Sequence, residues 1–338
     1  SRRRHTRFKC DWSSDVCSSD LEGFPLAVIR SAGLKGKSIG AVLRGLLLLP
    51  LSAWDAWRTL SRLRPAVVIG VGGYSSGPVV LLAALRGIPT LLMEQNATPG
   101  FTNRLLARVV TAAAVTYQES VATFGARAFV AGNPVREAFF AAAASAGQTA
   151  DEAQAPRVLV FGGSQGAHAI NVAMVEAAPL LAAAALPLAV THQTGERDVE
   201  EVRAGYARAG LAARVDPFLF EMPQEMAAAD VVVCRAGATT LAEVSAAGRA
   251  AILVPLPTAT DDHQRRNAEA MVARHAAVMV EQRHLTGARL ADEVLALARD
   301  PERRRTLGAA ARALARPDAA AGIVEKVLAL AEIGRAHV

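Results

Sequence analysis

The chain has 338 residues, of which 52% are hydrophobic and 20% are charged, and its formal net charge is +6 at pH 7. This composition excludes an intrinsically disordered protein, and the length allows two domains of ordinary size, each with its own core. The three cysteines lack the spacing of a metal site or a disulfide framework, which indicates a reducing compartment. No apolar run reaches the roughly 20 residues that a membrane span requires.

The two ends of the chain differ in character from the rest. Residues 1–20 join several arginines to a polar stretch without periodicity, and they lack the apolar core of a secretory signal. Both this segment and residues 332–338 resemble translated sequencing-adapter sequence. We therefore interpret both as foreign, exclude them from the predicted fold, and expect the authentic N-terminus to be missing.

From Leu21 onwards strand-like and helix-like segments alternate, which predicts a parallel α/β arrangement. A first domain is predicted at 21–140, with a helix from Gly77 to Arg86 and strands at 26–30, 66–71, 89–93, 110–116 and 128–131. The alanine-rich, polar segment 141–156 is predicted to be an interdomain linker. A second domain is predicted at 157–331, with a helical segment at 303–330 and strands at 157–161, 187–192, 213–218, 230–234, 250–254 and 277–280.

A basic segment lies early in the first domain. Between Glu22 and Arg64 seven basic residues accompany two acidic ones, beside Leu46 to Leu49 and the pair Trp54 and Trp57. Basic residues next to leucines and tryptophans suit an interfacial membrane surface, and an ordinary helix with a solvated basic face explains the pattern equally well. Nucleic-acid binding is not expected, because no recognition motif accompanies the charge.

Two glycine-rich turns, Gly70–Pro78 and Phe161–Ala167, each follow a short apolar run and open a helix-like stretch. In this layout backbone N–H groups and a helix N-terminus face an anion. The second turn lacks both the spacing of a dinucleotide fingerprint and the lysine of a P-loop. With Ser164 at its tip it would offer a hydroxyl and N–H groups to a diphosphate, whereas a turn needed only for packing is the alternative.

A third turn follows the apolar segment 230–234 and precedes a helix. Thr239 and Thr240 are expected to cap this helix and to leave N–H groups for phosphate. Glu243, one turn further on, would accept hydrogen bonds from ribose hydroxyls, and a carboxylate that only stabilises the helix start is an equally weighted alternative.

Polar residues also follow other predicted strands, where ligands bind in open α/β sheets. Asn96 and Arg136 stand at two such positions in the first domain, and Gln264 opens a helix in the second. A metal site at 261–263 is not expected, because three adjacent side chains do not converge readily on one ion.

Six motifs follow one another along the chain in the order that is typical of one protein family. They are Gly72–Pro78, Glu94–Asn96, Gly132–Arg136, Gly162–Ala167, Arg235–Thr240 and Asp262–Gln264. Through them, from about Ser31 to Ala331, the chain resembles the lipid II-forming N-acetylglucosaminyltransferases of glycosyltransferase family 28. The resemblance implies a GT-B fold, in which two Rossmann-like domains face a cleft. It also implies inverting transfer of N-acetylglucosamine from UDP-GlcNAc to the C4 hydroxyl of the muramoyl sugar of lipid I, without metal or cofactor, at the cytoplasmic face of the cell membrane.

The resemblance also implies which residues bind the two substrates. The donor, UDP-GlcNAc, would be held by Asn96, Arg136, Ser164, Leu219, Ala238, Thr239, Thr240, Leu241, Ala242, Glu243 and Gln264. The acceptor diphosphate would face Gly72, Gly73, Tyr74, Ser75 and Ser76.

One departure from the family concerns catalysis. The family begins with a strand and a glycine-rich turn that ends in a histidine, the favoured catalytic base, and nothing before Ser31 matches it. The catalytic residue is therefore left unassigned, and this chain is expected to bind UDP-sugar weakly with little transferase activity. A UDP-sugar-binding fragment without turnover and a UDP-GlcNAc 2-epimerase of the same fold are the alternatives.

Overall fold

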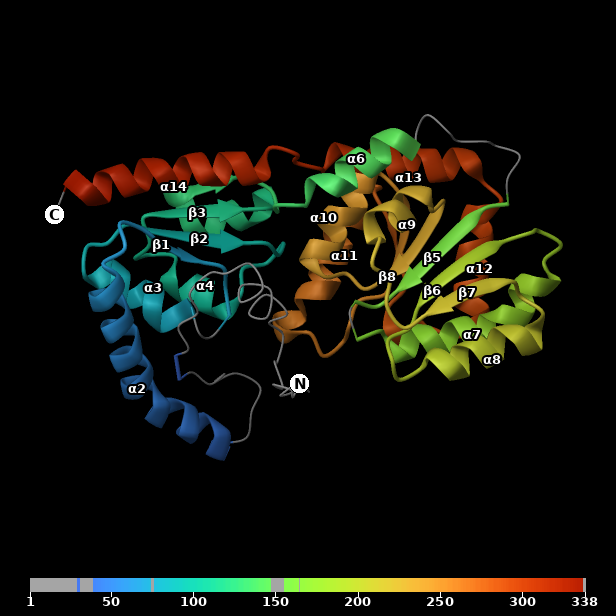
Figure 1. Cartoon of the computed structure of the whole chain (residues 1–338), viewed down its shortest axis with the longest axis horizontal. Coiled ribbons are helices and arrows are strands. Elements are labelled where there is room, and N and C mark those ends of the chain that lie inside the picture. The colour runs from blue at the N-terminus through green and yellow to red at the C-terminus, as the bar shows by residue number, and fades with distance from the viewer. Residues whose placement is uncertain (1–28, 31–38, 74–75, 147–154, 164, 337–338) are drawn as a thin grey trace, which may run out of the picture.

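A computed structural model describes residues 29–30, 39–73, 76–146, 155–163 and 165–336 of the chain. Within these residues there are two separate parallel β-sheets, of four and six strands, and helices surround each of them (Figure 1). The expected α/β fold with two parallel-sheet domains is confirmed.

The N-terminal sheet has its strands in chain order, β1 (Val68–Gly70), β2 (Thr90–Glu94), β3 (Ala112–Val115) and β4 (Ala128–Val130), all paired in parallel. The helical elements of this domain are α2 (Ile39–Leu63), α3 (Ser76–Leu85), α4 (Phe101–Leu106), η1 (Gln118–Ser120), α5 (Val121–Phe124) and η2 (Gly125–Arg127). The expected strand at 26–30 is not supported at residues 29–30, which lie in no strand, and its other residues lie outside the described ranges.

Both faces of the central strands β2 and β3 are buried, and successive side chains of each strand point to opposite sides. Leu92 packs with Leu60 of α2 and Val80 of α3 on one face. Leu91 packs on the other face with Ile323, from the C-terminal end of the chain. That partner belongs to helix α14 (Ala319–Ala336), which runs along the sheet beside β2 and β3 (Figure 1).

The C-terminal sheet has the order β10-β9-β8-β5-β6-β7, again parallel throughout. Its strands are β5 (Arg157–Phe161), β6 (Ala189–Gln193), β7 (Ala213–Asp216), β8 (Val231–Cys234), β9 (Ala250–Leu253) and β10 (Val278–Met279). The helical elements are α7 (His168–Ala183), α8 (Val199–Ala209), α9 (Met222–Ala228), α10 (Ala238–Ala247), η3 (Thr260–Asp262), α11 (His263–Val272), η4 (Gln282–His284), α12 (Gly287–Ala298) and α13 (Pro301–Ala313). Read from β7, this is the 3-2-1-4-5-6 order of Rossmann folds.

Period-two alternation places two layers of helices on this sheet. Val158 and Val160 of β5 point to the face covered by α7, α8 and α12. Leu159 and Phe161 point to the face covered by α9, α10 and α11. Because both of their faces are buried, the central strands β8 and β9 read as continuous apolar runs, which is typical of parallel sheets.

The chain crosses between the domains twice. After β4 it enters helix α6 (Glu137–Ala146), which packs on α9 and α10 of the C-terminal domain. It returns after α13, where Pro317 disfavours helical backbone at the residue before it, and α14 then docks on the N-terminal sheet. The helical segment expected at 303–330 is therefore two helices, and the second lies on the first domain.

The expected linker at 141–156 begins inside a helix. Residues 141–146 belong to α6, because alanine is the strongest helix former and Phe139 anchors this helix in the core of the C-terminal domain. Residues 147–154 lie outside the described part. At the other end, residues 332–336 continue α14.

The two crossings touch each other at Gly132, which has a left-handed backbone with φ +84°. A Cβ atom added there would lie 2.6 Å from Cβ of Arg316. We expect Gly132→Ala to lower the free energy of unfolding by about 2 to 4 kcal/mol, from backbone strain plus overpacking. Gly87→Ala is the matched control, because its φ is +72° and no atom lies within 4 Å of the added Cβ. It should cost only about 1 kcal/mol. Equal losses in urea unfolding would contradict the packing argument.

Candidate functional site

The C-terminal sheet changes its winding direction between β5 and β8. Phe161 at the end of β5 pairs in register with Cys234 at the end of β8. From these neighbouring ends the chain leaves in opposite directions, to α7 on one face and to α10 on the other. Such switch points are where open parallel sheets bind ligands, so the turns after β5 and β8 mark the site.

The turn after β5 needs its glycines for two reasons. A Cβ on Gly162 would overlap Ala167, and one on Gly166 (φ +74°) would overlap the carbonyl oxygen of Thr194. Gly163, in contrast, has φ +90° with open space around the missing Cβ. Packing thus accounts for two of the glycines, while the third lies on an open side of the turn. Ser164, the predicted diphosphate ligand, lies outside the described residues.

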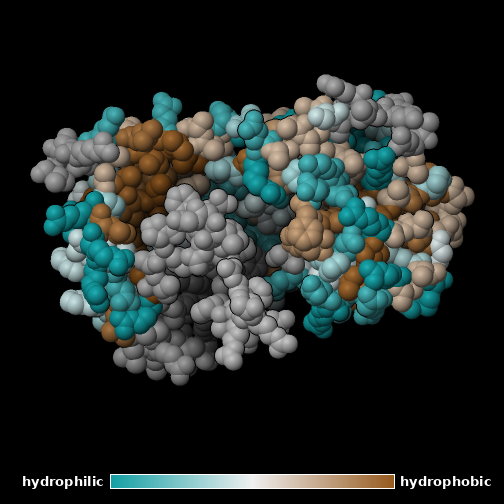
Figure 2. All heavy atoms as spheres, viewed as in Figure 1, coloured by the Kyte–Doolittle hydropathy of each residue, from teal (hydrophilic) through white to brown (hydrophobic). Residues whose placement is uncertain are grey.

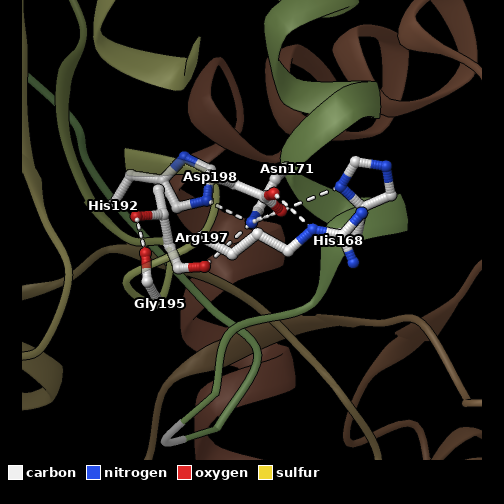
Figure 3. Close-up of polar contacts among 7 residues, drawn as sticks. His168, Asn171, His192, Gly195, Arg197 and Asp198 are labelled. Atoms are coloured by element: carbon white, nitrogen blue, oxygen red, sulfur yellow. Dashed lines mark hydrogen bonds and ion pairs between the residues drawn. The ribbon is translucent and has the colours of Figure 1, made fainter. Parts of the chain in front are cut away.

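A polar network fixes the loop against which this turn packs (Figure 3). Asn171 Nδ2 donates to the carbonyl oxygen of Thr194 over 2.9 Å and to Asp198 Oδ2 over 2.8 Å. His168 Nδ1, from the first residue of α7, lies 2.9 Å from the same carboxylate oxygen. Burial raises the pKa of Asp198, but hydrogen bonds from His168 and Asn171 outweigh it and hold that pKa below its usual range.

The network continues into the core through a neutral histidine. Burial lowers the pKa of His192 to about 3. Its Nε2 lies 3.0 Å from Asn171 Oδ1, which only accepts, so Nε2 carries the proton. Its Nδ1 then accepts from the hydroxyl of Tyr206 over 2.7 Å. Sequence reasoning missed this network, and the only available signal was a few polar residues within otherwise apolar segments.

The turn after β8 opens α10 without a side-chain cap. Gly237 is the N-cap residue, with extended backbone at φ −66° and ψ 143°, and as a glycine it supplies no side-chain capping hydrogen bond. The prediction that Thr239 and Thr240 cap this helix is wrong, because both residues already lie inside its first turn. The uncapped N–H groups give this end of the helix a partial positive charge.

Glu243 lies on α10 with its carboxylate mostly buried. Burial raises the pKa of Glu243 to about 7, although the nearby guanidinium of Arg136 opposes the shift. Among the described residues its carboxylate has no hydrogen-bond partner, so it does not cap the helix. A strongly shifted, unpartnered carboxylate beside a helix start is typical of a functional site.

Arg136 comes from the crossing between the domains. It lies over the ring of Phe139, 5.2 Å from its centroid, and faces Glu243. Leu219 has its side chain in the core beneath α9 and α10, so only its backbone is placed to meet a ligand. Its loop is tied to the one after β6, because Gly195 N donates to the carbonyl oxygen of Pro217 over 3.1 Å.

Gln264 and Arg235 brace the loop after β9. Gln264 is buried, and its Oε1 accepts from Leu256 N over 3.0 Å, which leaves its Nε2 without a partner among the described residues. Arg235 Nη1 donates to the carbonyl oxygens of Val254 and Pro255 over 3.1 and 3.3 Å. Burial lowers the pKa of Arg235 to about 10. The arginine of this motif therefore orders the site's backbone.

In the N-terminal domain, the predicted acceptor turn follows β1. Gly72 and Gly73 have φ of +95° and +79°, and no atom lies within 4 Å of a Cβ added at either. Glycine is therefore required at these two positions for the left-handed backbone and not for close packing. Ser76 Oγ donates to the carbonyl oxygen of Gly73 over 3.1 Å. Tyr74 and Ser75 lie outside the described residues.

Asn96 follows β2 and contacts the other domain. Its Nδ2 donates to Glu94 Oε1 over 3.1 Å, and its Oδ1 accepts from Asn267 Nδ2 of α11 over the same distance. The structure therefore brings together Asn96, α11 and the turn after β8. The remaining predicted donor residues Ala238, Leu241 and Ala242 lie on α10. In the part of the chain that the structure describes, no three His, Cys, Asp or Glu side chains form a metal-binding group.

Solved structures place this fold in a class. MurG of Acinetobacter baumannii superposes with a TM-score of 0.76 at 30% identity, over 93% of this chain and 87% of that one. A UDP-GlcNAc 2-epimerase from Neisseria meningitidis bound to UDP-GlcNAc shares the fold alone, with a TM-score of 0.59 at 14% identity, over 87% of this chain and 84% of that one. The match to MurG places the two-domain fold of this chain in the GT-B class of glycosyltransferases.

Sequence comparisons give the family. Residues 16–115 match the N-terminal domain of glycosyltransferase family 28, and residues 157–323 match its C-terminal domain. The UDP-N-acetylglucosamine--N-acetylmuramyl-(pentapeptide) pyrophosphoryl-undecaprenol N-acetylglucosamine transferase of Anaeromyxobacter sp. (strain K) is 48% identical over 91% of this chain and 80% of that protein. Its counterpart in Myxococcus xanthus is 46% identical over 88% of this chain and 78% of that protein. The chain belongs to glycosyltransferase family 28, as the motifs indicate.

The raised pKa of Glu243 predicts a pH-dependent stability gap between the wild type and Glu243→Gln. The folded carboxyl holds its proton more tightly than the unfolded one, whose pKa is 4.5. The wild type therefore loses stability as pH rises from 4.5 to 7, whereas glutamine does not titrate. Urea unfolding should show the gap widening in favour of Glu243→Gln by up to about 3 kcal/mol over this window.

The resemblance to the family implies that Glu243 accepts from the ribose hydroxyls, so we expect the same variant, in which an amide replaces the carboxylate, to bind UDP more weakly. Calorimetry at pH 8 checks this loss. Glu200→Gln is the control, because Glu200 is exposed on α8 and, among the described residues, its ion pair is with Arg203, so neither measurement should change appreciably. A stability gap that stays constant with pH would contradict the assignment of the shifted group.

Proposed function

We propose that this chain transfers N-acetylglucosamine from UDP-GlcNAc to the C4 hydroxyl of the muramoyl sugar of lipid I, which yields lipid II and UDP. The single observation that carries the proposal is the pair of glycine-containing turns after β5 and β8. They lie at the switch point of a sheet with the Rossmann strand order, in a chain of family 28. The relatives named above carry the same activity in their names.

The donor would bind at the carboxyl end of the C-terminal sheet. The diphosphate faces the N-termini of α7 and α10, including the N–H groups of Ala238, Thr239 and Thr240, with Ser164 completing the first turn. The backbone of Leu219 meets the uracil, Glu243 accepts from the ribose hydroxyls, and Gln264 donates its free Nε2 hydrogens to the sugar. Arg136 approaches from the crossing segment and adds positive charge.

The chemistry is a single displacement with inversion at the anomeric carbon. The acceptor hydroxyl attacks as the bond to the diphosphate oxygen breaks, and a base takes the hydroxyl proton. Two helix N-termini and Arg136 would stabilise the negative charge that develops on the departing UDP, as fixed dipoles do in other active sites. The acceptor diphosphate would lie at the open turn of Gly72 and Gly73.

Because the expected catalytic histidine has no match before Ser31, we expect the purified chain to form lipid II and UDP only slowly from UDP-GlcNAc and a lipid I analogue, and at the same rate in EDTA. Helix dipoles and arginine would replace a divalent cation at the leaving diphosphate, and no cofactor is required. Chromatography of the lipid product and of released UDP checks both points. Loss of turnover in EDTA, restored by Mg²⁺, would contradict the metal-independent chemistry.

Lack of product accompanied by calorimetric UDP binding would favour the alternative of a UDP-sugar-binding fragment. Conversion of UDP-GlcNAc to its 2-epimer without an acceptor would favour the epimerase, which shares the fold.

We further propose that the N-terminal domain binds the cytoplasmic face of the cell membrane peripherally. Within the described ranges, no helix is long and apolar enough to cross a bilayer. Trp54 and Trp57 of α2 are 58% and 48% exposed, and Arg86 lies over the ring of Trp57 at 4.6 Å. Further exposed apolar residues of α2 and α3 are Leu51, Leu63, Leu81 and Leu85. In Figure 2 the main brown area on this domain lies over α14 and the adjoining strands rather than over α2 and α3.

Replacing both tryptophans, Trp54→Ser with Trp57→Ser, should lower binding to vesicles that contain phosphatidylglycerol by about tenfold or more, because less apolar surface enters the interface. Sedimentation with vesicles measures the loss. Leu180→Ser is the control, since Leu180 is an exposed apolar residue on α7 of the other domain. Equal vesicle binding by all three proteins would rule out this surface.

A further inference from the structure

We propose that Asn267 is a positioning residue that holds the loop after β2 and the donor turn after β8 in one fixed arrangement. Asn267 lies on α11 and is fully buried. Its Oδ1 accepts from Ala97 N over 2.8 Å. Its Nδ2 donates to Asn96 Oδ1 over 3.1 Å and to the carbonyl oxygen of Ala236 over 3.3 Å. One side-chain amide therefore joins both domains.

The direction of this amide is fixed by its partners. Ala97 N can only donate, and the carbonyl oxygen of Ala236 can only accept. A rotated amide would place two donors together and two acceptors together. The arrangement therefore needs both atoms of an asparagine side chain, with each in its present place.

A buried carboxylate holds the other side of the junction. Glu94 Oε1 accepts from Asn96 N over 3.0 Å and from Asn96 Nδ2 over 3.1 Å. Glu94 Oε2 accepts from Gly100 N over 3.0 Å and from Asn103 Nδ2 over 2.9 Å. Because Glu94 takes the Nδ2 side of Asn96, Oδ1 of Asn96 is left to face Asn267.

The segment before α11 makes a further contact between the two domains. Asp261 Oδ2 accepts from Phe101 N, the first residue of α4, over 3.2 Å and lies 3.8 Å from Arg104 Nη2. Asp261 and Asp262 both have left-handed backbone, with φ of +56° and +57°. Such strain persists only where surrounding contacts hold it, and it clusters at functional sites.

The consequence for the reaction follows from the place of Ala236. The next residue, Gly237, is the N-cap of α10, so a shift of the Ala236 carbonyl moves the helix start that would receive the donor phosphates. Asn267 itself has no exposed surface and acts through this turn and through Asn96. The inference rests on the proposed function for its kinetic readout.

Asn267→Asp tests the inference with almost no change in shape. The carboxylate still accepts from Ala97 N, but an acceptor now faces both Asn96 Oδ1 and the carbonyl oxygen of Ala236. We expect kcat/KM for UDP-GlcNAc and the affinity for UDP to fall by about 30-fold at pH 8, in protein that circular dichroism shows to be folded. Asn267→Ser, whose hydroxyl serves fewer partners, should lower both by about tenfold.

Glu119→Gln is the matched control. Glu119 pairs with Arg274 across the same domain junction, at 2.5 Å, and among the described residues its side chain forms no hydrogen bond with the donor turn or with Asn96. It should retain wild-type kcat/KM and UDP affinity. If Asn267 served stability alone, its variants would melt at a lower temperature but would have the same kcat/KM and UDP affinity as Glu119→Gln. That result would overturn the proposal.

A pH series adds a readout that a structural role would not move. When the carboxyl of Asn267→Asp is protonated it can donate again, so the ratio of wild-type to variant UDP affinity should shrink as pH falls from 8 to 5.5. The neighbouring carboxylates Glu94 and Asp261 are common to both proteins and cancel in this ratio. A constant ratio would count against the donor role of Nδ2.

The two proposals fail in different ways. If the wild type forms no lipid II, the proposed function fails, while the UDP affinities of the two Asn267 variants still decide the inference.

Discussion

The pairing of β5 with β8 is the constraint on which the site depends. Backbone hydrogen bonds bring Phe161 and Cys234 level with each other, so the two chains leave the sheet at adjacent points. Since α7 and α10 then cover opposite faces, their N-termini begin beside one another. Two partial positive charges are thereby directed at one region by backbone groups, which cost far less to bury than cationic side chains would.

Buried polar side chains then fix loops that hydrophobic packing alone would leave free. Asn171 holds the carbonyl oxygen of Thr194, Glu94 holds the loop after β2, and Asn267 joins that loop to the donor turn. Each group is satisfied by several partners, because an unpaired buried amide or carboxylate would cost stability. Such networks specify one loop arrangement, whereas apolar contacts tolerate many.

Much of the fold could be predicted from the sequence, because apolar runs such as 230–234 report a strand buried on both faces. The docking of α14 could not, since Ile323 meets Leu91 more than two hundred positions away and its own periodicity does not name that partner. Thr239 and Thr240 were expected to cap α10 because threonine favours that position, but the tight exit from β8 places glycine there. Motif residues could be recognised singly, whereas Asn267 acquires its role only from contacts across domains.

Glu243 on α10 and Asn267 on α11 are two buried polar side chains near the turn after β8, and they affect stability in different ways. Burial of Glu243 without a partner raises its pKa to about 7, which leaves a carboxylate that a pair of hydroxyls would stabilise on binding. Asn267 is fully buried, yet its bonds are complete before any ligand arrives. An unsatisfied group stores free energy that a ligand releases, while a satisfied group supplies the rigid backbone from which that ligand is held. The site at the start of α10 needs both. If the backbone there were not held rigidly, the buried carboxylate of Glu243 would move into solvent and would no longer select its ligand.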